Sequence, residues 1–441
     1  MTRKKRLRRD EREARKWAER RTSHNAALLA THEYRAQQQA KVGKEPRREP
    51  IESLVSKGFR HLQQFFPDLK KHQLVSEFHR RGNRYDTNWD DPLSHSLMLD
   101  LQQQIEAACD ALGYQLRDGV SIGFLSAEST EAMQQSVMLT ETSVIMMTEN
   151  LHMLIHRTAK LLALTVPFEV VNGNQFKISE DIADAVALAN GNAQLREQWS
   201  KLFIDYAVAP GTPYRGDVVV VTGNERQTMW EDLGGAMNLF VVGHEYAHHI
   251  LKHSLSGSAS ASGLDVDASH RMEVEADILG LMLSMRAGHD EAIPNIFACF
   301  GVGAAVVLTV IEYSRHAAQV LAYGQVKDES RTTHPALRDR LECIAQIVPE
   351  LLKPHGSDQT GVVRRIHGMF VAIIQNAWNS AEEVLVRAHQ NGTRPIYSDN
   401  GGWLPGRGIG QSLVSDGHVE TSGDSTLDDR DRAVTHGRDR Q

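Results

Sequence analysis

Cysteine is scarce in this sequence, which has three cysteines in 441 residues. Cys109, Cys299 and Cys343 are odd in number and far apart, a pattern that fits neither a disulfide framework nor a CxxC metal site. We therefore expect a reducing compartment, in which the three thiols act as buried apolar side chains. The sequence also shows no internal repeat.

No apolar stretch follows the basic start of the chain. Residues 1–50 hold 16 Lys/Arg and 7 Asp/Glu, a net charge of +9 within an overall −7, which leaves −16 for the remainder. The start resembles the basic part of a signal peptide, but more charged residues follow it, so we expect a cytoplasmic protein. Residues 1–50 then form a charged arm, helical or disordered. Nucleic acid or an anionic membrane could bind it, although its alternating Glu and Arg favour a solvated arm.

Charge is absent from one long stretch, Ile293–Ile311, which is long enough to span a bilayer. Pro294, Gly301 and Gly303 interrupt it, and the chain offers no second span to pair with it. A fully buried core helix has the same pattern, and we favour that interpretation. Single-span or monotopic membrane association is the alternative.

The chain contains one HExxH motif, at positions 244–248. His244 and His248 are four residues apart, so on a helix they share a face and could bind one metal ion. Glu245 projects beside them, where it could take a proton from water. Apolar residues at helical spacing predict a mostly buried helix, in which polar groups need partners; they are residues 237, 240, 241, 247, 250 and 251. The alternative is a helix whose histidines are solvated or packed in the core.

A catalytic zinc ion usually takes three protein ligands, so a third ligand is needed. Glu273 is the best candidate, because it lies on a second predicted helix, entered after Asp267 or Ser269, from which it can point at the first. Asp277 lies four residues further on the same face, where it could accept the outer N–H of a ligand histidine. Gly280 would let the two helices approach closely. The alternative is an acidic, solvated first turn of that helix.

Two other candidates for the third ligand fit less well. Glu275 lies about 200° around its helix from Glu273. His253 comes five residues after His248, which turns it about 140° away on a continuing helix. We therefore expect His253 to be a surface residue near the end of that helix.

A further polar cluster precedes a predicted helix at 335–341. Pro335 is typical of a first helical position, which would put His334 at the mouth of the helix. There His334 could approach the open metal position or hydrogen-bond a developing oxyanion, with Arg340 as a possible helper. A helix cap without chemistry is the alternative.

In order, these motifs resemble those of the gluzincin peptidases, and within them the CAAX prenyl protease, HtpX and Oma-like group. That group shows HExxH, then Glu-x-x-Ala-Asp, then His-Pro before an Arg-containing helix. The matching residues are His244, Glu245 and His248, then Glu273, Ala276 and Asp277, then His334, Pro335 and Arg340.

The resemblance covers about residues 95–350. It implies that His244, His248 and Glu273 bind one zinc ion and that Glu245 is the general base. An insert-like stretch at 165–229 departs from the family pattern. The multiple membrane spans of the prenyl protease branch are absent, which favours a soluble bacterial member. A weaker likeness, carried by the HExxH helix alone, is to Lit-type phage-exclusion peptidases, which would imply a host-protein target.

We expect an α+β fold that is mainly helical, with a zincin metallopeptidase domain and a small edge sheet. The predicted parts are a short helical element at 51–94, the metallopeptidase domain at 95–390 and a disordered tail at 391–441. Within the domain we expect helices at 99–112 and 151–164 and strands at 120–125, 143–147 and 218–223.

The expected activity is hydrolysis of peptide bonds by metal-activated water, with Glu245 as general base and Asp277 and His334 in support. A protein or peptide substrate would bind extended along an exposed edge strand such as 143–147. The alternative is a non-catalytic metal-binding or sensor module that engages a partner through residues 1–50. Hydrolysis of a non-peptide amide would use the same zinc chemistry.

Overall fold

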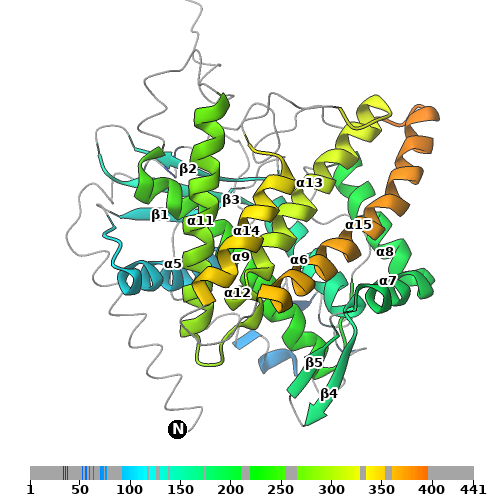
Figure 1. The fold of residues 1–441 in the computed structure, drawn as a ribbon, viewed down its shortest axis with the longest axis horizontal. Coiled ribbons are helices and arrows are strands. Elements are labelled where there is room, and N and C mark those ends of the chain that lie inside the picture. The colour runs from blue at the N-terminus through cyan, green and yellow to red at the C-terminus, as the bar shows by residue number, and fades with distance from the viewer. Residues whose placement is uncertain are drawn as a thin grey trace, which may run out of the picture.

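In a computed structural model of the chain, most of residues 92–395 and scattered residues from 33 to 76 are described; the gaps between 92 and 395 are 117–118, 126–129, 138–139, 173–174, 180, 210–218, 254–265, 328–333 and 353–359. The described chain is mainly helical with a small sheet (Figure 1), which confirms the expected α+β class at that level. The helices are α5 (Pro92–Leu112), α6 (Glu149–Thr165), α7 (Ile182–Gly191), α8 (Ala193–Val208), α9 (Asn224–Leu251), α11 (Val266–Asp290), α12 (Ile296–Cys299), α13 (Val302–Tyr323), α14 (Leu337–Leu352) and α15 (Thr360–Gln390).

The main sheet has three strands in the order β1-β3-β2. Strand β1 (Val120–Leu125) runs parallel to β3 (Ser143–Thr148), and β2 (Ala132–Ser136) pairs with β3 in the antiparallel sense. Every side chain of β1 and β3 is buried, as expected for uninterrupted apolar strands covered on both faces. The prediction that 143–147 is an edge strand is therefore wrong, because β3 is hydrogen-bonded on both sides. The two edge strands are β1 and β2, one on each side of β3.

Helix α9, which carries the HExxH motif, lies among the other helices and contacts α6, α11, α12, α13 and strand β2. Glycines bring two neighbours close to it. A Cβ on Gly280 of α11 would lie 2.7 Å from the backbone nitrogen of His244, and a Cβ on Gly303 of α13 would lie 2.4 Å from the carbonyl carbon of Ala236. The predicted role of Gly280 in close helix packing is confirmed.

The uncharged stretch Ile293–Ile311 is not one helix. It is divided between α12 and α13 at Gly301, whose φ of 67° places it in the left-handed region that favours glycine. Residues 302–311 are all buried against other helices, which confirms the favoured interpretation of a core helix for this part. In the part of the chain that the structure describes, no helix combines the length and the hydropathy needed to cross a membrane.

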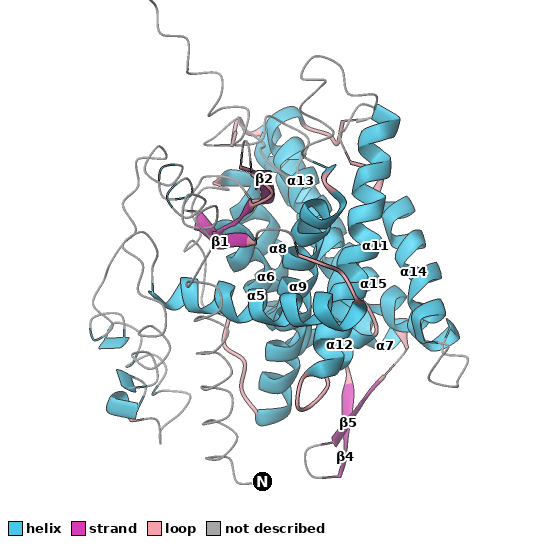
Figure 2. Ribbon diagram, turned by 90° about the vertical axis from the view of Figure 1, so that its left-hand side faces the viewer, coloured by secondary structure: helices cyan, strands magenta, loops and turns pink. Residues whose placement is uncertain are grey.

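Between α6 and α9 the chain forms a β-hairpin and two helices. Strands β4 (Phe168–Asn172) and β5 (Gln175–Ile178) make an antiparallel hairpin that projects from the helices (Figure 2), and α7 and α8 follow it. Helix α8 packs on α13 and α15. The predicted strand at 218–223 is wrong over its described part, since residues 219–222 pair with no strand and Gly223 precedes α9.

Only Glu33, Arg35 and Gln37 of the predicted basic arm are described, and all three are helical. Arg35 is 2% exposed and donates from Nε to the hydroxyl of Ser121 in β1, at 3.1 Å. The expectation of a solvated arm is therefore wrong at this residue.

The short helical element predicted at 51–94 is described only in part. Its described residues between 52 and 63, and residues 71–73, 75 and 76, are helical, as expected. Most of the predicted tail, residues 396–441, lies outside the described residues.

One hydrophobic core contains side chains from Met98 to Leu385, within the span predicted for the metallopeptidase domain. Cys109 belongs to this core and is fully buried. The prediction of buried thiols is wrong for Cys299 and Cys343, which are half-buried. None of the three forms a disulfide.

Candidate metal centre

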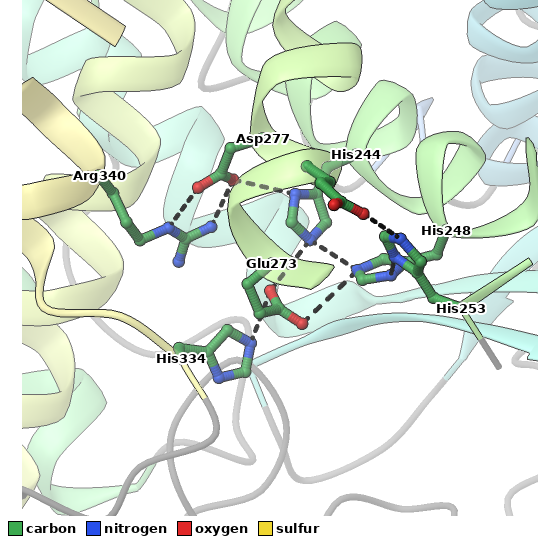
Figure 3. Close-up of polar contacts among 8 residues, drawn as sticks. His244, His248, His253, Glu273, Asp277, His334 and Arg340 are labelled. Atoms are coloured by element: carbon green, nitrogen blue, oxygen red, sulfur yellow. Dashed lines mark hydrogen bonds and ion pairs between the residues drawn. The ribbon is translucent and has the colours of Figure 1, made fainter. Parts of the chain in front are cut away.

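Two helices supply the candidate ligands. His244 and His248 lie one turn apart on α9, and Glu273 comes from the second turn of α11 (Figure 3). The helices approach through paired glycines, because a Cβ on Gly243 would also lie within 2.9 Å of the carbonyl oxygen of Gly280. This close approach allows side chains from both helices to meet.

Three ligand atoms converge at this point. Nε2 of His244 and Nε2 of His248 are 3.1 Å apart. Nε2 of His244 lies 3.4 Å from Oε2 of Glu273, and Nε2 of His248 lies 3.6 Å from Oε1 of the same carboxylate. Two ligand atoms on a tetrahedral zinc ion, each about 2.05 Å from it, are about 3.3 Å apart. Among the described residues, this is the one group of three or more His, Cys, Asp or Glu side chains with metal-ligand spacing. The predicted ligand set is therefore brought together.

The polarity of the group suits a cation. Oε2 of Glu273 is buried and makes no hydrogen bond within the described part of the chain, although Nε2 of His334 is 3.2 Å away. Burial would lower the pKa of His244, but the contacts with Asp277 and Glu273 outweigh it and raise that pKa to about 10. Without a metal, a proton on His244 and the guanidinium of Arg340 together balance the two carboxylates. A bound cation would take over this role and release the proton.

Asp277 holds the outer nitrogen of His244, as predicted. Nδ1 of His244 donates to Oδ1 of Asp277 at 3.0 Å. Arg340 of α14 donates to both oxygens of the same carboxylate, each at 2.6 Å. Burial would raise the pKa of Asp277, but the guanidinium outweighs it and the pKa is lowered. A carboxylate that accepts from Nδ1–H leaves Nε2 of His244 with a free lone pair, which is the form that binds a metal.

His253 is not the surface residue that we predicted. It is 8% exposed, and its Nδ1 lies 2.9 Å from Nδ1 of His248. His253 does not follow the helical spacing, because α9 ends at Leu251. Lys252 then takes a φ of 62°, which turns the chain so that His253 folds back beside His248. Nε2 of His253 contacts the carboxylate of Glu275 at 3.1 Å, which accounts for Glu275 lying outside the ligand group.

His334 lies beside Glu273 on the side away from Asp277 (Figure 3), so the structure brings it to the metal group as predicted. Helix α14 begins at Leu337, two residues later than expected. The first carbonyl that it uses is that of Ala336, so His334 is not its cap. Arg340 is 6% exposed and faces Asp277. Its predicted role as an oxyanion helper is therefore replaced by that of a clamp on Asp277.

Glu245 is 3% exposed and follows His244 on α9. Its role as general base stays a prediction. Burial lowers the pKa of His248 to about 3, and the neighbouring histidines add to this, so its imidazole is neutral at pH 7. A neutral imidazole is the form of histidine that binds a metal ion.

Comparison with known proteins identifies no relative. No protein-family model matches the chain, and neither a curated protein nor a solved structure matches it. The resemblance to gluzincins therefore rests on the motifs and on the geometry that joins them.

A polar link between α9 and the three-stranded sheet was not predicted from the sequence. The hydroxyl of Ser143 in β3 lies 2.7 Å from Nδ1 of His249 on α9 and accepts a hydrogen bond from Gln134 of β2 at 2.6 Å. His249 thereby fixes α9 against the strands beside the metal group. A histidine next to the motif gave no signal of this role, because its partners come from strands whose order the sequence did not predict.

Proposed function

We propose that this protein is a zinc-dependent endopeptidase with a gluzincin-type centre. His244, His248 and Glu273 would hold one zinc ion. The observation that carries the proposal is the convergence of three ligand groups: the two Nε2 atoms are 3.1 Å apart, and each lies 3.4 or 3.6 Å from one oxygen of the Glu273 carboxylate, close to the edge length of a zinc tetrahedron. Three protein ligands are typical of catalytic zinc, whereas structural zinc sites usually have four.

Zinc bound there would act as a Lewis acid and lower the pKa of a water molecule to about 7. Glu245 would accept a proton from the attacking water and pass it to the leaving amine. His334, at the edge of the group, would donate a hydrogen bond to the oxygen of the tetrahedral intermediate. Asp277 and Arg340 would keep His244 in its ligand orientation.

The substrate would bind extended, as a strand added to β2. This edge strand contacts α9, and its four residues from Met133 to Ser136 are half-buried rather than fully covered. Strand addition satisfies backbone groups of the substrate without selecting its side chains. Proteins or unfolded peptides are therefore the proposed substrates, rather than small amides.

The test is zinc content together with cleavage of an unfolded protein substrate. Wild type should hold about one zinc ion per chain, and Glu273→Ala should lose it or bind it far more weakly. Glu245→Gln should keep zinc and lose cleavage by about 10²-fold or more. Glu197→Ala, on the exposed side of α8, is the matched control and should behave as wild type.

The outcomes separate the two candidate classes. Zinc binding without any cleavage would favour the non-catalytic metal-binding or sensor module. A folded wild type that binds no zinc after reconstitution would refute the peptidase. Retained cleavage in Glu245→Gln would refute the role of that residue alone.

A further inference from the structure

The two ligand histidines are held by different partners at their outer nitrogens. Nδ1 of His244 meets a carboxylate, Asp277, whereas Nδ1 of His248 meets a second imidazole, that of His253. Beyond His253 lies the carboxylate of Glu275, 3.1 Å from Nε2. Three side chains thus form a line that leads outward from the metal group: His248, His253 and Glu275.

The chemistry of this line fixes which nitrogens carry protons. A carboxylate accepts, so His253 donates to Glu275 from Nε2. A neutral imidazole has one N–H, which leaves Nδ1 of His253 as an acceptor for Nδ1–H of His248. Nε2 of His248 then keeps a free lone pair, and this is the nitrogen that lies 3.1 Å from Nε2 of His244 and 3.6 Å from Glu273.

The backbone supports the same arrangement. Lys252 is the only residue other than glycine with a positive φ in the described part of the chain. A left-handed conformation costs a non-glycine residue of the order of 1 kcal/mol and persists where surrounding contacts enforce it. Here it ends α9 and turns His253 inward, where the imidazole is 8% exposed and packs edge-to-face on His248 with ring centroids 5.0 Å apart.

We infer that His253 and Glu275 are positioning residues of the metal centre, which hold His248 in the tautomer and ring orientation that bind zinc through Nε2. The inference rests on the proposed function in so far as it requires zinc at His244, His248 and Glu273. Neither residue belongs to the proposed ligand group. Glu275 reaches the centre from a side chain that is 60% exposed, so the line extends from the ligand to the protein surface.

The test is the zinc dissociation constant of the full-length chain, measured by competition with a chromophoric chelator, and the visible absorption spectrum of the cobalt-substituted protein. Loss of the outer partner of a metal ligand typically weakens binding about 10–100-fold. His253→Ala should show such a loss and an altered cobalt spectrum. His253→Asn should recover most of the affinity, because its side-chain oxygen can accept from Nδ1–H of His248.

Two further variants guard against a general effect on folding. Glu275→Ala changes only an exposed side chain and should still weaken zinc binding several-fold. His289→Ala removes an exposed histidine at the end of the same helix and should leave affinity and spectrum unchanged.

Wild-type zinc affinity and cobalt spectrum in both Glu275→Ala and a folded His253→Ala would overturn the inference while leaving the proposed function intact. If the variants lose zinc affinity as predicted but wild type has no peptidase activity, the inference would stand and the proposed peptidase function would be overturned. No zinc binding in folded wild type would overturn both.

Discussion

At the residue scale, Asp277 has the most demanding set of partners in the centre. One carboxylate oxygen accepts from both His244 and Arg340, and the other accepts from Arg340 alone. All three side chains are buried, so no water can replace a lost partner easily. Breaking one member of such a group leaves a buried charge without compensation, which is costly.

We therefore predict that Asp277→Asn weakens zinc binding about 10–100-fold and lowers the free energy of unfolding by about 3–5 kcal/mol. Chelator competition and urea unfolding measure the two effects. Asp339→Asn is the matched control, because Asp339 pairs with Arg338 on the exposed side of α14. Equal behaviour of the two variants would show that the clamp on His244 contributes nothing.

A second, partly buried ion cluster lies on α13. Glu312 accepts from Arg315 at 2.6 Å and pairs with His316 at 3.1 Å. Burial would raise the pKa of Glu312, but His316 and Arg315 outweigh it and lower that pKa from 4.5 to about 2. A carboxylate with a lowered pKa stabilises the fold above its unfolded-state pKa, and this contribution disappears as the pH falls toward the folded-state value.

Glu312→Gln should accordingly cost stability at pH 7, with an upper limit of about 3 kcal/mol. The difference from wild type should stay constant down to about pH 5 and shrink steadily below pH 4.5. Urea unfolding across this range checks it, with the exposed Glu197→Gln as control. A difference that does not change between pH 7 and pH 3 would contradict the prediction.

The sequence predicted the residues of the centre where local spacing decides their placement. His244 and His248, like Glu273 and Asp277, are four apart on one helix, and the structure places each pair on one face. The position of His253 was predicted wrongly, because nothing in the residue type of Lys252 indicates a left-handed turn. Such turns are usually made by Gly or Asn.

At the element scale, the contact between α9 and α11 sets the geometry of the centre. The helices meet where Gly243 faces Gly280, and any larger side chain there would push them apart. Both candidate ligand histidines follow Gly243 within five residues, and Glu273 precedes Gly280 by two turns. Helix separation at the glycines therefore controls the distance between nitrogen and oxygen ligands.

Gly280→Ala should destabilise the protein by about 1–3 kcal/mol and weaken zinc binding, since the added methyl group would lie 2.7 Å from the backbone of His244. Gly234→Ala is the matched control on α9. Its Cβ would meet Ala159 at an ordinary 3.7 Å, so this variant should gain about 0.5–1 kcal/mol. Thermal unfolding and chelator competition test both, and a neutral Gly280→Ala would show that the helices can separate freely.

The strands show where local pattern stops being informative. Apolar runs predicted β1 and β3 and the helix that follows β3. Strand β2 was missed, because Gln134, Gln135 and Ser136 give its sequence a weak strand signal. The order of the strands depends on hydrogen bonds between distant segments, so the exposed edge was assigned to the wrong strand.

At the scale of the whole molecule, the two halves of the described chain share one core. Helix α13 is buried along most of its length, and it packs on α9 from one side and on α8 and α15 from the other. The sequence could not place the segment between α6 and α9, because its helices are stabilised by α13 and α15, which come much later in the chain. Helix α9, which carries the HExxH motif, is thus supported by α13, and α13 is in turn packed against α8 and α15.

Ending the chain after residue 352 should abolish cooperative unfolding, because α15 contributes Phe370, Ile373 and Trp378 to the core over α13. Ending it after residue 395 keeps every described element and is the control, which should unfold as wild type does. Circular dichroism during thermal unfolding distinguishes the two. A cooperative transition in the shorter chain would show that α13 does not need α15 packed against it for the protein to fold.

The clamp between Asp277 and Arg340 spans 63 residues of sequence, and α15 follows it. During synthesis, the ribosome therefore releases all three proposed zinc ligands well before the arginine that orients Asp277 and the helix that covers α13. A growing chain therefore has its proposed ligands and Asp277 before Arg340, which holds that carboxylate, has been made. If the protein cleaves unfolded polypeptides, an unfinished copy would hold its zinc more weakly than the complete chain does.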